Sequence, residues 1–344
     1  GNKRLRLLTK DGRSSIVAAD EPAFSMEIDD NREVAATKLR YTYDSLTAPR
    51  IFYEVDVATG ERTVLKRTPA PNYDPSLYVT ERVWAPARDG TKIPVSLVYR
   101  KGFKRDGTAA MLQIGYGAYG SSYDPEWKPT IPGLLDRGMV YAIAHIRGGQ
   151  EMGRAWYDQG HLLHKKNSFT DFIDVTRHLV AEGYAAKDRV AAFGRSAGGL
   201  LMGAVANMAP EDYRVIVTEV PFVDGVTTML DASIPLTSNE WDEWGNPAGR
   251  EHYDYILSYS PYDNVAAKAY PAIYVSTGLW DSQVQYYEPA KWVARLRARK
   301  TDRNPLLFRT NMDAGHGGKS GRFEKYRSTA EYEAFMLSQL GINE

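Results

Sequence analysis

The segment Val190-Ala191-Ala192-Phe193-Gly194-Arg195-Ser196-Ala197-Gly198 carries the pattern G-x-S-x-G directly after a short apolar run. A serine in this pattern lies on a tight turn between a strand and a helix, and glycine on either side avoids a side-chain clash. The following residues, Ala197 to Asn207, favour a helix whose positive N-terminal end points toward the serine. The segment therefore predicts a strand, a sharp turn and a helix, with Ser196 as the candidate nucleophile.

Apolar runs on both sides of this motif alternate with helical patterns. Such alternation predicts an α/β fold over residues 71–344, with a mostly parallel, twisted sheet and helices on both of its faces. A hairpin that turns at Asp89-Gly90 is expected to lead into this sheet. The predicted strands are Ala109 to Ile114, Met139 to Ile146, Val190 to Phe193, Val215 to Val220 and Ala272 to Thr277, and the clearest helices are Asp171 to Glu182 and Glu288 to Arg299.

A serine hydroxyl is inert near neutral pH, so its use as a nucleophile requires a base and an orienting carboxylate. In an α/β-hydrolase these follow the serine in the order Asp or Glu, then His. Two of the six histidines follow Ser196. His252 lies among charged and tyrosine residues on a predicted helix, whereas His316 lies in a glycine-rich loop close to the last helix. We therefore expect His316 to be the base.

The carboxylate is expected just after a strand, because functional loops of an α/β sheet lie at the carboxyl ends of its strands. Asp281 follows the predicted strand 272–277 and the turn Gly278-Leu279-Trp280. Asp263 and Asp313 are the alternatives, and Asp313 is so near His316 in sequence that we expect it to cap its own loop. Asp281 is the predicted third member of the site.

The developing oxyanion needs two hydrogen-bond donors. The backbone N–H of Ala197, next to the nucleophile, is one candidate. The second is expected from the loop Gly115-Tyr116-Gly117-Ala118-Tyr119-Gly120, which follows the predicted strand 109–114. A tyrosine hydroxyl or a backbone amide of this loop could serve, and a glycine-rich turn with aromatic packing is the structural alternative.

Composition limits the kinds of partner and cofactor. Lys plus Arg and Asp plus Glu both number 43 in the 344 residues, so no overall field draws the chain to nucleic acid or to an anionic membrane. The absence of cysteine excludes disulfides, thiolate nucleophiles and Cys-based zinc sites, and fits a reducing, cytoplasmic compartment. No apolar run reaches the ~20 residues of a membrane helix. We expect no metal and no organic cofactor.

Residues 1–70 differ from the rest of the chain in their sequence pattern. Short alternating runs, such as Lys38 to Tyr43 and Arg50 to Val57, predict antiparallel strands joined by turns. So few strands make a marginal domain on their own, because their faces and edges need partners. We therefore expect them to be the end of a larger β assembly that begins upstream, with a linker at Thr68 to Pro75.

The motifs together resemble those of the prolyl oligopeptidase family, and within it the oligopeptidase B branch, over essentially the whole chain after the linker. Gln283 stands where prolyl oligopeptidases proper usually carry Arg, which favours the oligopeptidase B branch over a post-proline preference. The residues that carry the resemblance are Gly115 to Gly120, Arg147-Gly148-Gly149, Gly194 to Gly199, Gly278 to Tyr286 and Gly315 to Arg322.

The resemblance implies a catalytic triad of Ser196, Asp281 and His316, with Tyr116 as the side-chain half of the oxyanion hole and no cofactor. It also implies that residues 1–70 are the last strands of a β-propeller whose missing part is the expected partner, either in the same polypeptide or as a separate chain. In this family the propeller covers the active site and restricts substrates to short peptides.

An acidic segment addresses specificity. Asn239-Glu240-Trp241-Asp242-Glu243-Trp244 places three carboxylates beside aromatic residues, and we expect it just after a strand end. An unpaired buried carboxylate is costly, so an acidic pocket suits an incoming cation such as a substrate Lys or Arg. A solvated acidic turn is the alternative. The resemblance implies that Glu240 and Asp242 hold the P1 side chain, and that Asp124 and Glu126 receive a basic P2 residue.

These observations predict a serine endopeptidase that cleaves short peptides after Lys or Arg through an acyl-enzyme. A post-proline oligopeptidase, a carboxylesterase of the same fold and a non-catalytic scaffold are the alternatives. The acidic segment counts against the esterase, because a pocket for an acyl chain should be apolar.

Overall fold

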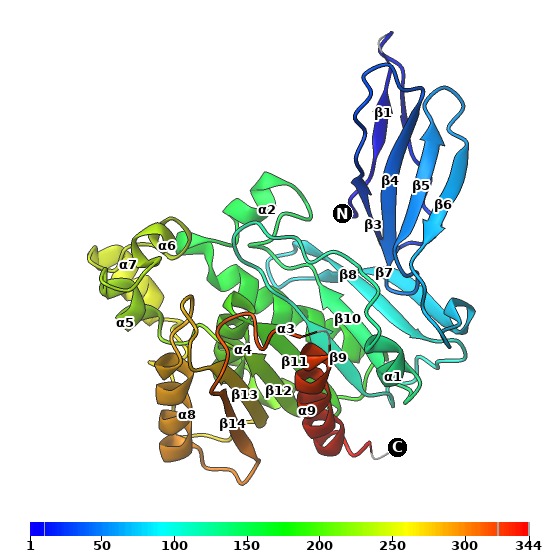
Figure 1. Cartoon of the computed structure of the whole chain (residues 1–344). Helices are drawn as coiled ribbons and strands as arrows, with labels where there is room; N and C mark the ends of the chain where they lie inside the picture. The colour runs from blue at the N-terminus through cyan, green and yellow to red at the C-terminus, as the bar shows by residue number, and fades with distance from the viewer. Residues whose placement is uncertain (10, 322, 343–344) are drawn as a thin grey trace.

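The computed structural model describes residues 1–9, 11–321 and 323–342, which form three sheets. The N-terminal strands project from a larger sheet that carries helices on both faces (Figure 1). The change from the N-terminal sheets to the larger one falls between the strand that ends at Arg67 and the strand that begins at Tyr78.

The larger sheet has eight strands in the order β14-β13-β12-β11-β9-β10-β8-β7. The six strands from β9 to β14 run parallel to one another. The β7–β8 hairpin continues the sheet in antiparallel pairing, with β8 next to β10. The strands are β7 (Tyr78–Pro86), β8 (Lys92–Arg100), β9 (Met111–Ile114), β10 (Val140–Ala144), β11 (Val190–Arg195), β12 (Val215–Glu219), β13 (Ala272–Gly278) and β14 (Leu306–Asn311).

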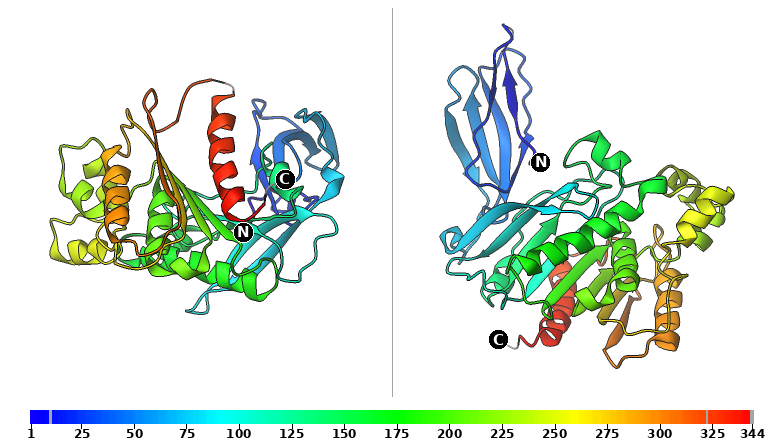
Figure 2. Two further views of the ribbon diagram at one scale, coloured as in Figure 1. Left: turned by 90° about the horizontal axis from the view of Figure 1, so that it is seen from below. Right: turned by 180° about the vertical axis from the view of Figure 1, so that it is seen from behind.

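Successive residues of a strand point to opposite faces of the sheet, and both faces are buried. On β11, Ala192 packs into a core formed with α3 (Lys166–Ala181), α4 (Ala197–Met208) and α8 (Tyr287–Arg299). The neighbouring Ala191 packs into the opposite core. That second core contains α1 (Ile131–Leu135) and α9 (Glu324–Gln339). Figure 2 shows the red C-terminal helix α9 on one side of the strands and the long green helices α3 and α4 on the other.

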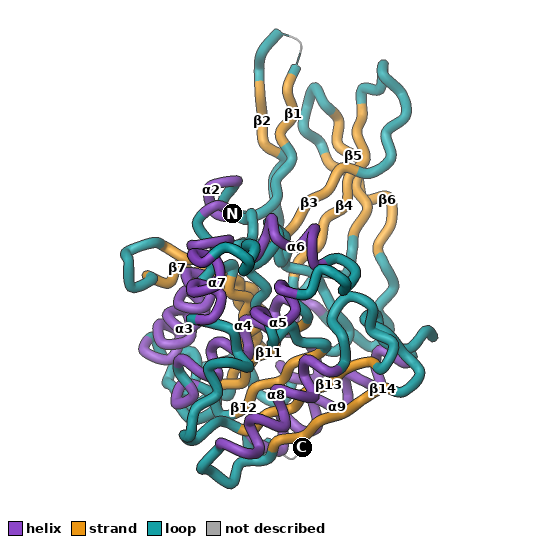
Figure 3. The backbone as a smooth tube through the Cα atoms, turned by 90° about the vertical axis from the view of Figure 1, so that its left-hand side faces the viewer, coloured by secondary structure: helices purple, strands orange, loops and turns teal. Residues whose placement is uncertain are grey.

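The remaining helices lie mainly beside the carboxyl ends of the parallel strands. Among them, α5 packs against both α6 and α7 (Figure 3). The expectation that the acidic segment 239–244 follows a strand end is wrong, because it forms most of a helix that comes after α5. These elements are α2 (Arg154–Asp158), α5 (Gly225–Leu230), α6 (Thr237–Trp244) and α7 (Arg250–Leu257), with 3-10 turns at Pro75–Leu77, Leu162–His164 and Pro210–Asp212.

The N-terminal strands form a four-stranded antiparallel sheet, β3-β4-β5-β6, beside a two-stranded one, β1-β2. Tyr41, Tyr43 and Tyr53 form the centre of its small core, with the rings of Tyr41 and Tyr53 stacked 5.3 Å apart. The described residues contain one such sheet and no closed propeller, so the assignment to a propeller stays a prediction. The strands are β1 (Arg6–Leu8), β2 (Ser14–Ile16), β3 (Phe24–Ile28), β4 (Lys38–Ser45), β5 (Ile51–Asp56) and β6 (Arg62–Arg67).

The predicted α/β fold is confirmed. All five predicted strands of the larger sheet are present, and the hairpin that turns at Asp89-Gly90 joins β7 to β8. The strand β14 was not predicted: its apolar run is only Leu306 to Phe308, three polar residues follow, and its side chains are alternately exposed. Within the described residues, no helix combines the length and apolar character that crossing a membrane requires.

Candidate active site

Ser196 lies between β11 and α4, at the point where the strand order of the sheet reverses. The chain passes from β9 to β10 on one side and then returns to β11 on the other, which leaves a crevice between β9 and β11. The backbone of Ser196 has φ 58° and ψ −117°, an unfavourable conformation for a residue with a side chain. A Cβ atom at Gly194 would lie 2.1 Å from the carbonyl oxygen of Gly198, so the turn needs glycine.

The structure brings the three predicted triad residues together from the ends of three strands. His316 Nε2 lies 3.1 Å from Ser196 Oγ, and His316 Nδ1 lies 2.8 Å from Asp281 Oδ2. The other carboxylate oxygen of Asp281 accepts the backbone N–H groups of Gln283 and Val284, both at 2.9 Å. The Asp281 side chain is fully buried, so its contacts hold the carboxylate in one orientation.

The rival residues are located elsewhere. Asp313 pairs with Lys319 at 2.9 Å, and His252 accepts the backbone N–H of Asn246 from its place on α7. Asp281, rather than Asp263 or Asp313, contacts His316.

Two donors converge on the space next to Ser196. Ala197 begins α4, so its N–H belongs to the first turn, where amides have no partner within the helix. Tyr116 lines a cavity together with Ser196 and His316. Burial, and then the nearby carboxylates of Glu240 and Glu243, raise the pKa of Tyr116 to about 12, so the hydroxyl stays protonated and able to donate. This arrangement can stabilise a tetrahedral oxyanion.

A small cavity of about 60 Å³ opens beside the nucleophile. Ser196 and Ala197 line one side of it, and Glu240 and Trp244 of α6 line another. Glu240 Oε2 accepts two hydrogen bonds, from the Tyr119 hydroxyl at 2.6 Å and from the Trp244 ring N–H at 2.8 Å. Of the four residues expected to bind the substrate side chains, Glu240 therefore lines the same cavity as Ser196.

Asp242 does not join Glu240 in this cavity. Residues two apart on a helix point in different directions, and Asp242 is exposed to solvent. The carboxylate that shares the face of Glu240 is Glu243, three residues on. Glu243 is buried, accepting the Tyr119 N–H at 2.9 Å and the Tyr157 hydroxyl at 2.7 Å. The segment is therefore a helix and not a turn, and of its three carboxylates only that of Asp242 is exposed.

Asp124 and Glu126 lie outside the two cavities that contain Ser196. Asp124 is mostly buried and its carboxylate lies 2.6 Å from the ammonium group of Lys3, while Glu126 is exposed. Tyr123, the residue before Asp124, lines the second cavity, of about 270 Å³, together with Ser196 and His316. The structure thus brings Asp124 to the edge of the site and leaves Glu126 on the surface.

Two residues that support the site were missed from the sequence. Tyr119 has φ 58° and reaches both Glu240 and Glu243. The ammonium group of the buried Lys165 donates to the Gly117 carbonyl and lies 5.1 Å from the centre of the Trp244 ring. Burial lowers the pKa of Lys165 to about 8, and Glu243 opposes that shift. The position of Tyr119 in a glycine-rich loop could have indicated its role from the sequence. Nothing in the residues around Lys165 indicates that this lysine is buried.

A nucleophile turn after a central parallel strand, with a carboxylate and a histidine from the next strands of the sheet, defines the α/β-hydrolase class of serine hydrolases. Comparison with known families narrows this class. The model of the prolyl oligopeptidase family matches residues 126–343, and the chain belongs to that family.

Individual relatives agree with this assignment. The chain is 67% identical to "Dipeptidyl aminopeptidase BI" of Pseudoxanthomonas mexicana, over 98% of this chain and 47% of that protein. It is 49% identical to "Protease 2" of Moraxella lacunata, over 96% of this chain and 48% of the relative. The structure of oligopeptidase B from Leishmania major superposes with a TM-score of 0.91 at 43% identity, covering 96% of this chain and 47% of that one. The chain spans about half the length of these relatives.

Proposed function

We propose that the protein is a serine oligopeptidase that cleaves short peptides after Lys or Arg. The observation that carries this proposal is the Glu240 carboxylate in the cavity beside Ser196. Both hydrogen bonds to Glu240 go to Oε2, and no bond to Oε1 is found among the described residues. A substrate ammonium or guanidinium group would pair with that oxygen, and a charge-assisted bond of this kind is about twice as strong as a neutral one.

The chemistry follows from the geometry of the site. His316 accepts the proton of Ser196 as its oxygen attacks the peptide carbonyl, while Asp281 holds the histidine ring in the required tautomer. Tyr116 and the Ala197 amide donate to the oxyanion. The tetrahedral intermediate collapses when His316 gives its proton to the leaving amine. Water then attacks the acyl-enzyme by the same steps, releasing the new carboxylate and restoring Ser196.

The relatives support the peptidase assignment, and one of them adds a second candidate function. The relative that is 67% identical is named a dipeptidyl aminopeptidase, which describes release of dipeptides from a free amino terminus. We propose this mode as the alternative to endopeptidase cleavage. In either mode the upstream half of the protein, as a propeller that restricts access to short peptides, is the proposed partner of this chain, and Asp124 is the proposed contact for a basic P2 residue.

Hydrolysis of matched reporter amides by the full-length gene product tests both modes. The substrates end in Arg-Arg before the reporter, with the amino terminus either free or acylated, and a Gly-Pro substrate and a p-nitrophenyl ester serve as comparisons. We expect cleavage of both Arg-Arg amides, abolished by Ser196→Ala. Cleavage of the free amine alone would favour dipeptide release. Preference for the Gly-Pro substrate would contradict the role of Glu240 as the partner of a basic side chain. Turnover of the ester alone would indicate an esterase. No turnover of any substrate would favour a non-catalytic scaffold.

A further inference from the structure

The loop that carries His316 is packed tightly before the histidine and loosely after it. A Cβ atom at Gly315 would lie 2.7 Å from the Trp280 carbonyl oxygen, so the chain there lies directly against the loop of Asp281. By contrast, a Cβ atom at Gly317 or Gly318 would meet nothing within 4 Å. The loop is therefore packed against its neighbours up to Gly315, and this packing ends at His316.

Arg195 supports His316 from the other direction. Its guanidinium group donates to the main-chain carbonyl of His316, across 121 positions of sequence. In the described part of the chain, this is the one hydrogen bond found to the backbone of His316. Arg195 immediately precedes Ser196, so the bond joins the turn of the nucleophile to the loop of the base.

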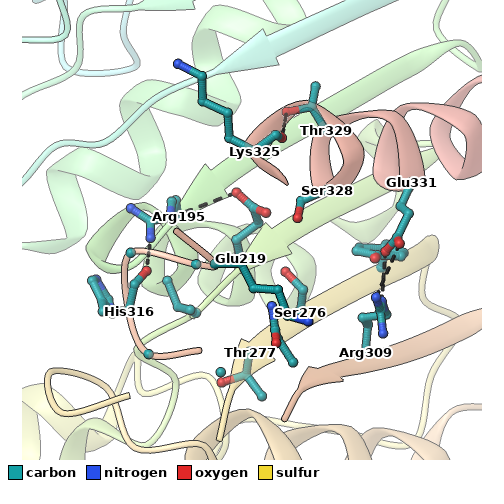
Figure 4. A pocket seen from close by; sticks show the side chains of 18 residues that line it. Arg195, Glu219, Ser276, Thr277, Arg309, His316, Lys325, Ser328, Thr329 and Glu331 are labelled. Carbon is teal, nitrogen blue, oxygen red and sulfur yellow. Dashed lines mark hydrogen bonds and ion pairs between the residues drawn. The ribbon is translucent and has the colours of Figure 1, made fainter. Parts of the chain in front are cut away.

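Glu219 lies on the other side of the Arg195 side chain. Its carboxylate is 3.9 Å from Arg195 Nε, and its main-chain carbonyl accepts the Ser196 N–H at 3.0 Å. Burial raises the pKa of Glu219, and the charge of Arg195 opposes that rise. Figure 4 shows Arg195 between Glu219 and the main chain of His316. These residues line a cavity of about 240 Å³ behind the histidine.

We infer that Arg195 is a positioning residue that ties the His316 loop to the nucleophile turn and so keeps the base within reach of Ser196. This inference rests on the proposed use of Ser196 and His316 as nucleophile and base. A guanidinium group suits the task because its planar fork can donate to two acceptors at once. Two other cations that line the cavity are held in ion pairs: Arg309 pairs with Glu331 at 2.8 Å and Lys319 with Asp313 at 2.9 Å. The third, Lys325, lies 5.1 Å from the centre of the Tyr326 ring.

Substitution of Arg195 by methionine in the full-length protein tests the inference. Misplacement of a catalytic group by about 1 Å can cost ~100-fold, so we expect Arg195→Met to lower kcat by roughly 10-fold to 100-fold. The inhibition constant of a substrate-like competitive inhibitor should stay within about twofold, because the Glu240 cavity is untouched. Arg309→Met is the matched control: it removes the same charge from the same cavity and should leave kcat near the wild-type value.

Chemical rescue separates positioning from a general structural defect. Arg195→Ala enlarges the cavity but leaves the Glu219 carboxylate and the His316 carbonyl in place. An added guanidinium ion can donate to both, so guanidinium chloride at low millimolar concentration should raise the kcat of Arg195→Ala several-fold. Tetramethylammonium chloride lacks N–H donors and should not. Saturating substrate is needed, because guanidinium also competes for Glu240.

The outcomes are distinguishable from failure of the proposed function. If wild type neither turns over peptides nor reacts with a fluorophosphonate at Ser196, the proposed function fails and takes the inference with it. If wild type is active and Arg195→Met retains its kcat within about twofold, only the inference is overturned. Loss of kcat with an unchanged melting temperature and recovery by guanidinium would support it, whereas a loss that Arg309→Met reproduces, or that guanidinium leaves unchanged, would overturn it.

Discussion

Two pairs of acidic residues lie near the candidate site, and they differ in the hydrogen-bond donors and cations that already contact them. On α6, Glu240 and Glu243 share one helix face and receive hydrogen bonds from tyrosine and tryptophan side chains or from backbone. Before α1, Asp124 is already paired with the Lys3 ammonium group, and Glu126 faces solvent. Neutral donors orient a carboxylate and leave its charge for a ligand, whereas an internal cation neutralises it. Glu240 is therefore prepared for a substrate cation, whereas Asp124 must first release Lys3.

The largest expected effect concerns the charge of Glu240. Glu240→Gln keeps the shape of the side chain but removes the negative charge. Loss of one partner from a desolvated charge pair costs several kcal/mol, so kcat/KM for an Arg-terminated amide should fall ~100-fold. The same amide with norleucine in place of Arg should change little. Equal losses on both substrates would mean that Glu240 shapes the cavity without reading the charge.

A smaller effect is expected for the donor that orients Glu240. Tyr119→Phe removes the hydroxyl that lies 2.6 Å from Glu240 Oε2 but keeps the aromatic ring. Hydrogen bonds to charged groups contribute ~1.5–3 kcal/mol, so kcat/KM for the Arg amide should fall about 10-fold. Tyr157→Phe is the matched control, because its hydroxyl contacts Glu243 instead; it should lower the melting temperature more than the selectivity. Equal loss of selectivity in both variants would contradict this division of roles.

Asp124 should have a weaker effect because Lys3 competes for it. Asp124→Asn is expected to lower kcat/KM about threefold for peptides with Arg at P2, and Lys3→Met to raise it by a similar factor, as weak ion pairs do. The ratio of rates for Arg and Gly at P2, measured against pH, gives a second check. Burial raises the pKa of Asp124 and Lys3 opposes this, so the ionised form should be lost on acidification at a higher pH than for an ordinary aspartate, and higher still in Lys3→Met.

Asp242 should have the smallest effect of the four. Its side chain is exposed and does not line the cavity, so Asp242→Asn should change kcat/KM for basic substrates by less than about twofold. The measurement is kcat/KM of Asp242→Asn and Glu240→Gln on the same basic substrate, which compares two carboxylates of one helix. A large loss in Asp242→Asn would mean that substrates bind further along α6 than the cavity indicates.

Part of the candidate site could be predicted from the sequence, and part of it could not. The nucleophile turn was predictable because Gly194 and Gly198 meet a local steric requirement, and the order of Ser196, Asp281 and His316 follows from the strand order. The pairing of Glu240 with Asp242 came from the resemblance, and it did not take account of the helix α6, on which residues two apart point in different directions.

Contacts between distant segments were also hidden. Arg195 reaches His316 across 121 positions, and Lys3 reaches Asp124 from the segment before β1. Neither leaves a pattern in the residues around it. The edge strand β14 has alternate side chains in contact with solvent, and its three apolar residues make too short a run to indicate a buried strand.

The strained backbone of Ser196 has a consequence for the mutational landscape of the motif. Gly194 and Gly198 are closed to side chains by contacts of 2.1 Å and 3.0 Å, and Gly199 by a contact of 2.4 Å with Pro221. Ala197 is buried, so its position has little room for a larger residue. Within the turn, only Arg195 has a side chain that reaches solvent without such a constraint. The pentapeptide therefore has one sterically open position, and because the Arg195 guanidinium group donates to the His316 carbonyl, evolution or a combinatorial library that changes this residue also acts on the base.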